Sequence, residues 1–200
     1  MEIIVRKYGG TSLDSIAKIK KIAETTKKSI AQGKKIVLVV SAMGKSTDEL
    51  LKKAKMLSKH ANTRELDLLM SSGEIVSSAL MSIALQELGL KAISLTGFQA
   101  GIDTNSTFGE AQIISIDNKR IHNEINNGRI VVIAGFQGYN ENFEITTLGR
   151  GGSDTTAVAL AISLKADICE VYTDVEGIFT ADPRIVKNAK KIDYLSYEDM

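Results

Sequence analysis

The sequence predicts an α/β fold, a three-layer α/β/α sandwich with a mainly parallel central sheet. Segments with strand patterns alternate with segments with helix patterns along the chain, and this order is typical of parallel sheets covered by helices. Two strand-like segments, 35–40 and 129–134, are almost continuous apolar runs, as expected of strands buried on both faces. Ligands of such sheets bind at the carboxyl ends of the strands.

Glycines and capping residues mark the predicted elements in the first half of the chain. Ser12 is a residue type that caps helices, and apolar residues at helical spacing follow it until Gly33. Gly89 ends a second, longer helix in the same way. The predicted elements are strand 3–8, helix 12–33, strand 35–40, helix 47–59, helix 63–88 and strand 92–95.

The second half continues the alternation without an internal repeat or a linker, so we expect a single domain over residues 1–200. Pro183 is the chain's one proline, so no proline interrupts the elements before it. The predicted elements are loop 97–109, strand 112–116, helix 118–127, strand 129–134, hairpin 139–147, helix 156–164 and strand 168–173.

The composition is that of an ordinary globular protein, with 44% apolar and 24% charged residues. A net charge of +1 gives no reason to expect nucleic acid or a membrane surface as a partner. Cys169, the single cysteine, lies in an apolar run and is predicted to be a buried structural thiol in a reducing compartment. The N-terminus lacks the pattern of a signal peptide and no apolar stretch reaches membrane-spanning length, so we expect a cytoplasmic protein.

The segment Thr147-Leu-Gly-Arg-Gly-Gly-Ser-Asp-Thr-Thr156 predicts an anion site. Its glycines allow backbone N–H groups to approach an anion at the start of the next helix, where the helix dipole favours negative charge. Arg150 adds a planar donor that suits a carboxylate or a phosphate. The alternative is a glycine-rich turn in which Ser153 is an ordinary helix cap.

Polar, glycine-bearing clusters occur where the predicted strands end, and they would meet at one edge of the sheet. Such a crevice, lined by backbone N–H groups and cations, would suit a ligand with several phosphates. Lys7 is predicted to bind phosphate rather than to be a solvated surface lysine, and Arg6 is expected to face the other way. The clusters are 7–12, 41–47, 135–138 and 173–177, with 148–154 opening a helix.

Two common nucleotide-binding patterns do not fit. Gly44-Lys-Ser46 resembles the end of a P-loop, but Val39 stands where that pattern needs its first glycine. Gly9 and Gly10 lack the spacing of the dinucleotide fingerprint.

Glu74 is predicted to lie on or beside the buried stripe of helix 63–88, because it is close in angle to Met70 and Met81. Small neighbours would let another segment come close to it. A buried carboxylate needs a partner, which would be a substrate ammonium or an internal lysine or arginine. The predicted stripe is Leu66, Leu69, Met70, Gly73, Met81 and Leu88.

These features together resemble the aspartokinases, of the amino acid kinase family. The resemblance runs along the whole chain, from Lys7-Tyr-Gly-Gly-Thr-Ser12 to Leu195-Ser-Tyr-Glu-Asp199. The combination is specific, although each motif alone is not. The motifs in between are Val40-Ser-Ala-Met-Gly-Lys-Ser-Thr-Asp48, Ser71-Ser-Gly-Glu74, Leu148-Gly-Arg-Gly-Gly-Ser-Asp154 and Tyr172-Thr-Asp-Val-Glu-Gly-Ile-Phe-Thr-Ala-Asp-Pro-Arg184.

The resemblance implies transfer of the ATP γ-phosphoryl group to the β-carboxylate of L-aspartate, the first step of lysine, threonine and methionine synthesis. Mg²⁺ would be carried with the nucleotide, and no residue is assigned as a metal ligand. Lys7 and Asp154 would be catalytic, with Asp154 orienting Lys7 or the metal shell rather than acting as a base. The implied ATP-binding residues are Lys7, Tyr8, Gly9, Gly10, Ser41, Thr173, Asp174, Phe179, Thr180, Asp182, Pro183 and Arg184. The implied aspartate-binding residues are Thr47, Glu74, Arg150, Gly151, Gly152 and Ser153.

In this family the kinase domain continues with more helix and then with two ACT-type regulatory domains. We therefore expect residues 1–200 to be a C-terminally incomplete catalytic domain of an allosteric, homo-oligomeric enzyme. The alternatives are a related kinase acting on glutamate, N-acetylglutamate, carbamate or UMP, and a catalytically silent ligand-binding fragment. A P-loop NTPase is the least favoured, because of Val39.

Overall fold

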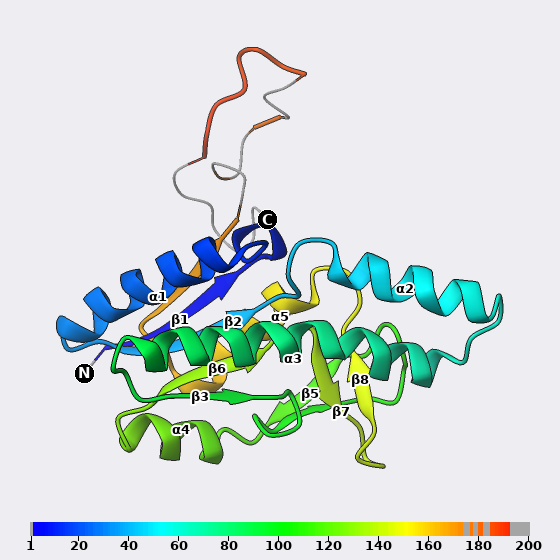
Figure 1. The fold of residues 1–200 in the computed structure, drawn as a ribbon, viewed down its shortest axis with the longest axis horizontal. Coiled ribbons are helices and arrows are strands. Elements are labelled where there is room, and N and C mark those ends of the chain that lie inside the picture. The colour runs from blue at the N-terminus through cyan, green and yellow to red at the C-terminus, as the bar shows by residue number, and fades with distance from the viewer. Residues whose placement is uncertain (1, 174–176, 178–179, 182–184, 193–200) are drawn as a thin grey trace.

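A parallel five-stranded sheet forms the centre of the structure (Figure 1). The structure is a computed structural model and describes residues 2–173, 177, 180–181 and 185–192. All four strand pairings in this sheet are parallel. The inner strands are buried on both faces, which explains their continuous apolar runs. The predicted fold class is confirmed. In spatial order the strands are β3 (Ala92–Leu95), β6 (Ile130–Ala134), β2 (Lys35–Val40), β1 (Ile3–Tyr8) and β9 (Ile168–Tyr172).

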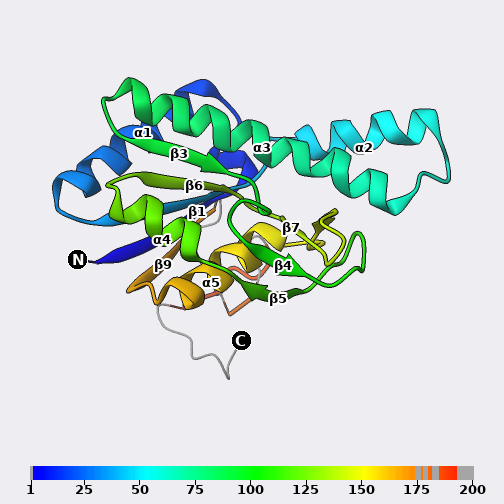
Figure 2. The same ribbon diagram turned by 90° about the horizontal axis from the view of Figure 1, so that it is seen from below.

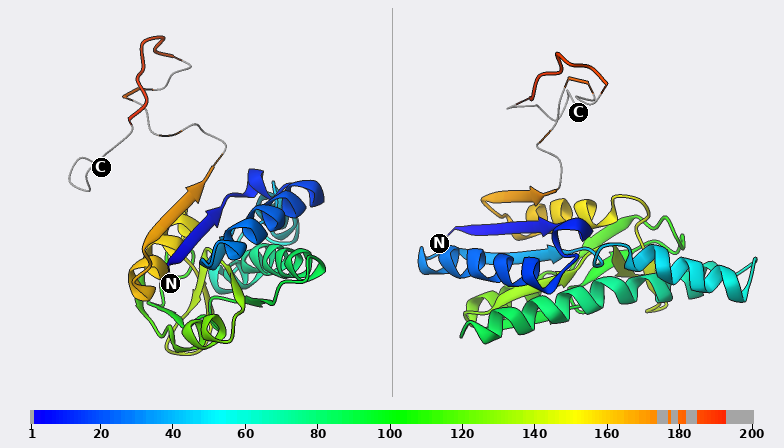
Figure 3. Two further views of the ribbon diagram at one scale, coloured as in Figure 1. Left: turned by 90° about the vertical axis from the view of Figure 1, so that its left-hand side faces the viewer. Right: turned by 45° about the horizontal axis from the view of Figure 1, so that its top comes forward.

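Helices cover both faces of this sheet and enclose two apolar cores. Helices α1 and α3 pack on one face through residues such as Ile19 and Met81, whereas α4 and α5 pack on the other through Ile121 and Leu160 (Figure 3). Helix α2 lies beside the N-terminal half of α3 and extends beyond the sheet (Figure 2). The helices are α1 (Ile16–Ala31), α2 (Ser46–Leu57), α3 (Thr63–Glu87), α4 (Lys119–Asn126) and α5 (Gly152–Leu164).

A second, smaller sheet of four strands lies beside the end of α5 that begins at Gly152. Its strands β7 and β8 form the hairpin predicted at 139–147, although β7 begins slightly earlier. The expectation that 97–109 is entirely loop is wrong, because β4 pairs with both β5 and β7. The three residues of β4 show no strand pattern of their own, and their pairing partners lie further along the chain. The strands are β4 (Ile102–Thr104), β5 (Ile113–Ile116), β7 (Gln137–Tyr139) and β8 (Ile145–Thr147).

Two predicted helix starts are wrong by about one turn. Ser12 belongs to a short 3-10 helix, η1 (Gly10–Ser12), and α1 is capped instead by Ser15, whose hydroxyl accepts the Lys18 N–H at 3.4 Å. Helix α5 begins at Gly152, after a left-handed Gly151 with φ of 76°. Ser153 therefore lies inside the helix, and the alternative interpretation of Ser153 as its cap is wrong.

Helix α3 buries a stripe of small and acidic residues rather than the predicted leucines. Leu66, Leu69, Met70 and Leu88 are only partly buried. A Cβ on Gly73 would lie 2.8 Å from that of Ala42, so the loop after β2 packs directly on the helix backbone. The buried residues are Asp67, Ser71, Gly73, Glu74, Ser77, Ser78, Met81, Ser82 and Leu85.

Among the described residues, α3 is the one helix long and apolar enough to cross a membrane, contrary to the sequence expectation. It packs against α1, β3, β6 and β8 within the fold. Its buried face carries two carboxylates, Asp67 and Glu74. These contacts identify α3 as a core helix of this fold.

Cys169 is exposed, so the prediction of a buried thiol is wrong. It lies on β9, which is at the edge of the sheet and pairs with β1 alone among the described strands. An apolar run in a sequence cannot distinguish a strand in the middle of a sheet from one at its edge.

We predict that Gly10→Ala destabilises the fold whereas the neighbouring Gly9→Ala does not. A Cβ on Gly10 would lie 2.7 Å from the Ala42 carbonyl oxygen, and a Cβ on Gly9 would find nothing closer than 3.6 Å. The backbone clash should cost about 1–3 kcal/mol of unfolding free energy, and Gly9→Ala should change it by less than about 1 kcal/mol. Urea denaturation of both variants measures this, and equal stabilities would contradict the tight packing of the two loops.

Candidate active site

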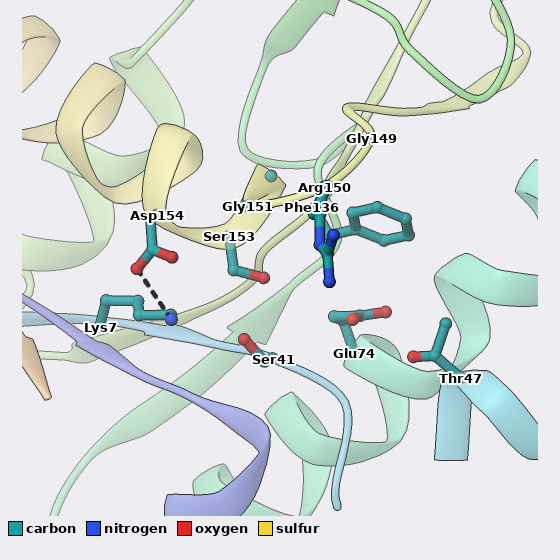
Figure 4. A pocket seen from close by; sticks show the side chains of 11 residues that line it. Lys7, Ser41, Thr47, Glu74, Phe136, Gly149, Arg150, Gly151, Ser153 and Asp154 are labelled. Carbon is teal, nitrogen blue, oxygen red and sulfur yellow. Dashed lines mark ion pairs between the residues drawn. The ribbon is translucent and has the colours of Figure 1, made fainter. Parts of the chain in front are cut away.

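Four of the predicted clusters, 7–12, 41–47, 135–138 and 148–154, contribute residues to one edge of the parallel sheet, and most of the fifth, 173–177, lies outside the described residues. A cavity of about 310 Å³ lies at this edge, beside the N-terminus of α5 (Figure 4). All of its lining residues except Phe136 and Gly149 are among the site residues predicted from the sequence. The lining is Lys7, Ser41, Thr47, Glu74, Phe136, Gly149, Arg150, Gly151, Gly152, Ser153 and Asp154.

Lys7 and Asp154 form an ion pair at one end of the cavity, with 2.8 Å between Nζ and Oδ1 (Figure 4). The Lys7 side chain on β1 is only 10% exposed, whereas that of Asp154, in the first turn of α5, is 48% exposed. A buried ammonium group needs a partner, so Asp154 holds Lys7 in a defined direction. This is the geometry expected of a carboxylate that orients Lys7.

The two neighbours of Lys7 on β1 point to the opposite face of the sheet, as alternation along a strand requires. Arg6 is buried there and bonds Glu170 and the Ser29 hydroxyl. Tyr8 is buried and stacks on Tyr172, with 4.7 Å between ring centroids. The Tyr8 ring therefore does not line the cavity, although the resemblance groups it with Lys7.

Glu74 reaches the cavity from α3, and one of its two carboxylate oxygens has a hydrogen-bond partner among the described residues. Its Oε1 accepts the Ala42 N–H at 3.0 Å, while its buried Oε2 has no hydrogen-bond partner among the described residues. The internal lysine or arginine considered from the sequence is not found within the described part of the chain. Burial raises the pKa of Glu74 from 4.5 to about 7. The cavity therefore presents a carboxylate that lacks a cation.

Arg150 extends from the loop between β8 and α5 toward Glu74 (Figure 4). Gly149 and Gly151 on either side of it have φ values of 75° and 76°, a left-handed conformation that favours glycine. These two glycines allow the turn that directs Arg150 into the cavity. A guanidinium and an unpaired carboxylate thus lie on opposite sides of one space.

The other predicted residues are more dispersed. Gly9 and Gly10 follow β1 at the start of η1, and Thr173 lines a separate hollow with Tyr8 and Tyr172. Thr180 exchanges hydrogen bonds with Lys190 rather than with any cavity residue. The predictions at Asp174, Phe179, Asp182, Pro183 and Arg184 lie outside the described residues.

Phe136 is a cavity residue that the sequence reasoning missed. Its φ of 69° is rare for a residue other than glycine. The conformation is held by the Phe136 N–H, which donates to the Thr156 hydroxyl at 3.1 Å, and by its carbonyl, which accepts the Leu148 N–H at 2.9 Å. The cluster at 135–138 marks the segment, but no sequence pattern reveals a left-handed aromatic residue.

The cavity combines a cation paired with Asp154, an unpaired carboxylate and a guanidinium. A small zwitterion fits this arrangement, because its ammonium would pair with Glu74 and its carboxylate with Arg150. Within the described ranges, no group of three or more histidine, cysteine or acidic residues could hold a metal ion by itself.

Comparison with known proteins gives three consistent similarities. The family model described as "Amino acid kinase family" matches residues 2–200. The chain is 56% identical over its full length to an aspartokinase of Geobacillus stearothermophilus, and covers 49% of that protein. It therefore spans about half the length of the curated relatives it matches.

Solved structures share the same fold. An aspartate kinase from Synechocystis superposes with a TM-score of 0.81 at 51% identity, over 94% of this chain and 31% of the other. Aspartokinase III of E. coli, in complex with aspartate and ADP, gives a TM-score of 0.82 at 27% identity, over 96% of this chain and 54% of the other.

We predict that the burial of Glu74 makes the ligand-free chain less stable as the pH rises from about 4.5 to 7. Over this range the folded chain keeps a proton that the unfolded chain has already lost, because burial raises the folded-state pKa of Glu74 to about 7. One pKa unit corresponds to about 1.4 kcal/mol, so the contribution of Glu74 is at most ~3.5 kcal/mol.

Glu74→Gln removes this titration, and the measurement is the unfolding free energy of variant and wild type between pH 4 and 8. The difference in unfolding free energy between variant and wild type should be constant at the acidic end. As the pH rises to about 7, the variant should become more stable relative to the wild type. Glu141→Gln is the control of opposite sign, because backbone and Ser106 hydrogen bonds lower the pKa of that exposed carboxyl. A difference for Glu74→Gln that stays flat with pH would contradict the buried, unpaired state.

Proposed function

We propose, from the premise that this chain belongs to the amino acid kinase family, that it is the kinase domain of an aspartate kinase. The reaction would transfer the γ-phosphoryl group of ATP to the β-carboxylate of L-aspartate, giving ADP and 4-phospho-L-aspartate. The aspartokinase relatives and the E. coli neighbour that holds aspartate and ADP support this proposal.

The observation that carries the substrate is the opposition of Glu74 and Arg150 across one cavity. L-Aspartate has one ammonium and two carboxylates. Glu74 would bind the ammonium and Arg150 the α-carboxylate, with hydroxyls of Thr47 and Ser153 completing the shell. The β-carboxylate would then face Lys7, where the phosphoryl group is expected.

The nucleotide phosphates would bind at Lys7 and the N-terminus of α5. The backbone would come close to the phosphates at Gly9, Gly10 and Ser41. The dipole of α5 would favour the negative charge of the phosphates. The nucleoside contacts implied for Thr173, Thr180 and the segment 174–184 remain predictions.

Mg²⁺ would be held mainly by the phosphates and would neutralise their charge. Asp154, with half of its side chain exposed beside Lys7, is the carboxylate of the cavity suited to contact the metal shell.

The chemistry requires little acid–base catalysis. A carboxylate acceptor is already ionised at neutral pH, so no side chain has to remove a proton. The difficulty is to bring two anions together, and charge neutralisation and positioning supply the catalysis. Lys7 would stabilise the transferring group, and Asp154 would keep its ammonium aimed at that group.

A kinase of the same family with another acceptor is the second candidate. The Glu74 carboxylate disfavours carbamate, UMP and N-acetylglutamate, because none of these offers a free ammonium. Glutamate differs from aspartate by one methylene and must be distinguished by assay. A catalytically silent fragment is the candidate from a different class.

We further propose that residues 1–200 form one catalytic domain of a cytoplasmic enzyme, and that its full-length form is a homo-oligomer. These statements rest on the resemblance to aspartokinases.

The proposal is tested by ADP release with Mg-ATP, with and without L-aspartate, and with L-glutamate as the control. We expect turnover that depends on aspartate and is at least tenfold weaker with glutamate, the scale of discrimination that one methylene allows. If the 200-residue chain is silent, the assay is repeated on the complete chain that the gene encodes. Turnover that ignores aspartate there would refute the substrate.

We predict that Asp154→Asn lowers kcat by roughly tenfold to a hundredfold, since Lys7 loses the charge that orients it. Steady-state kinetics at saturating aspartate and Mg-ATP measure the effect. Asp103→Asn, on β4 and outside the cavity lining, is the matched control and should leave kcat unchanged. Near-normal turnover by Asp154→Asn would contradict the orienting role.

A further inference from the structure

Asp67 is a buried carboxylate that the proposed reaction does not use. It lies on α3, seven residues before Glu74 and therefore on the same side of the helix. The residue is 0% exposed. Its partners within the described part of the chain are hydrogen-bond donors rather than cations.

Three donors from two segments satisfy this carboxylate. Oδ2 accepts the N–H of Gly109 at 3.0 Å and the N–H of Thr147 at 2.8 Å. Oδ1 accepts the Thr147 hydroxyl at 2.9 Å. Hydrogen bonds to a charged acceptor are stronger than neutral ones, so Asp67 fastens both segments to α3.

Both segments adjoin the loop that carries Arg150. Thr147 ends β8, three residues before Arg150, and its carbonyl accepts the Ala111 N–H at 2.9 Å. A Cβ on Gly149 would lie 3.2 Å from the Gly109 carbonyl oxygen. The Arg150 loop therefore packs directly on the segment that Asp67 holds.

Gln137 supplies a second tie between the same elements. Its buried Nε2 donates to the Ser71 carbonyl of α3 at 2.9 Å, and on the hairpin it pairs with Thr147. Ser71 lies one turn before Glu74 on α3. Hydrogen bonds thus join α3, which carries Glu74, to the hairpin that leads to Arg150.

We propose that Asp67 is a positioning residue that sets the separation between Glu74 and Arg150. The identity of the amino-acid ligand rests on the proposed function, whereas the fixing of the loop does not. Without the three hydrogen bonds, Arg150 keeps its charge but loses its defined place. Aspartate binding then weakens, while nucleotide binding at the Lys7 end of the cavity stays the same.

The test compares Asp67→Ala with Asp67→Asn in the complete chain by steady-state kinetics. Asp67→Ala should raise KM for aspartate at least tenfold, with KM for ATP within twofold of wild type. Asparagine keeps an oxygen for both backbone N–H groups, and its amide can donate to the Thr147 hydroxyl. Asp67→Asn should therefore restore KM for aspartate to within about threefold of wild type.

Two controls separate positioning from general loss of stability. Leu85→Ala truncates a core side chain on the same helix, away from the cavity, and should lower Tm without changing KM for aspartate. If Asp67→Ala does not fold, Thr147→Val against Thr147→Ser carries the test, because only serine keeps the hydroxyl donor. Valine should raise KM for aspartate two- to fivefold relative to serine.

Amide hydrogen exchange of residues 109 and 147–151 gives a readout that needs no turnover. Exchange should be at least tenfold faster in Asp67→Ala than in Leu85→Ala, and near the wild-type rate in Asp67→Asn. Unchanged exchange, or a KM for aspartate that moves equally in Asp67→Ala and Leu85→Ala, would overturn the positioning role. Wild-type protein without aspartate-dependent turnover but with the expected exchange pattern would refute the proposed function and leave the positioning role supported.

Discussion

Helices cover both faces of the parallel sheet, so a charged side chain on a strand is buried unless it lies where the strand ends. A buried charge is costly unless it is paired. Lys7 is subject to this constraint, because it is the next-to-last residue of β1 and is largely buried. Its ammonium is tolerated because the first turn of α5 brings Asp154 to 2.8 Å. Arg6, one position earlier, needs its own partner on the other face and finds Glu170. The sheet thus determines both where the cavity lies and which charge reaches it.

Three carboxylates near the cavity differ in how completely they are satisfied. Asp67 has three donors and no exposure, which suits a structural anchor. Asp154 has a cation and remains half exposed, which suits a group that both orients Lys7 and meets solvent or metal. Glu74 has one backbone donor and, within the described ranges, one buried oxygen without a partner; burial raises its pKa to about 7. An arriving ammonium would relieve that cost, and this is the physical reason to place the substrate amine there.

Most of the fold follows from local pattern. Continuous apolar runs indicate β2 and β6, and glycines at 33 and 89 indicate where α1 and α3 end. Two of the misses share one cause, which is that local pattern carries no information about neighbouring strands. The three-residue β4 exists because β5 and β7 pair with it, and Cys169 is exposed because β9 is at an edge.

Residue types and their spacing were enough to indicate the chemistry of the site. Lys7, Arg150 and Asp154 stand where a strand ends or a helix begins, and such positions converge in a parallel α/β sheet, whereas Glu74 lies in the middle of α3 and is placed by the buried stripe of that helix. Which of these charges are paired depends on the folded chain. Lys7 reaches Asp154, Glu74 lacks a cation within the described chain, and Asp67 joins segments 42 and 80 residues away. Pairing depends on distances of a few ångströms between distant segments, and residue type and spacing do not encode such distances.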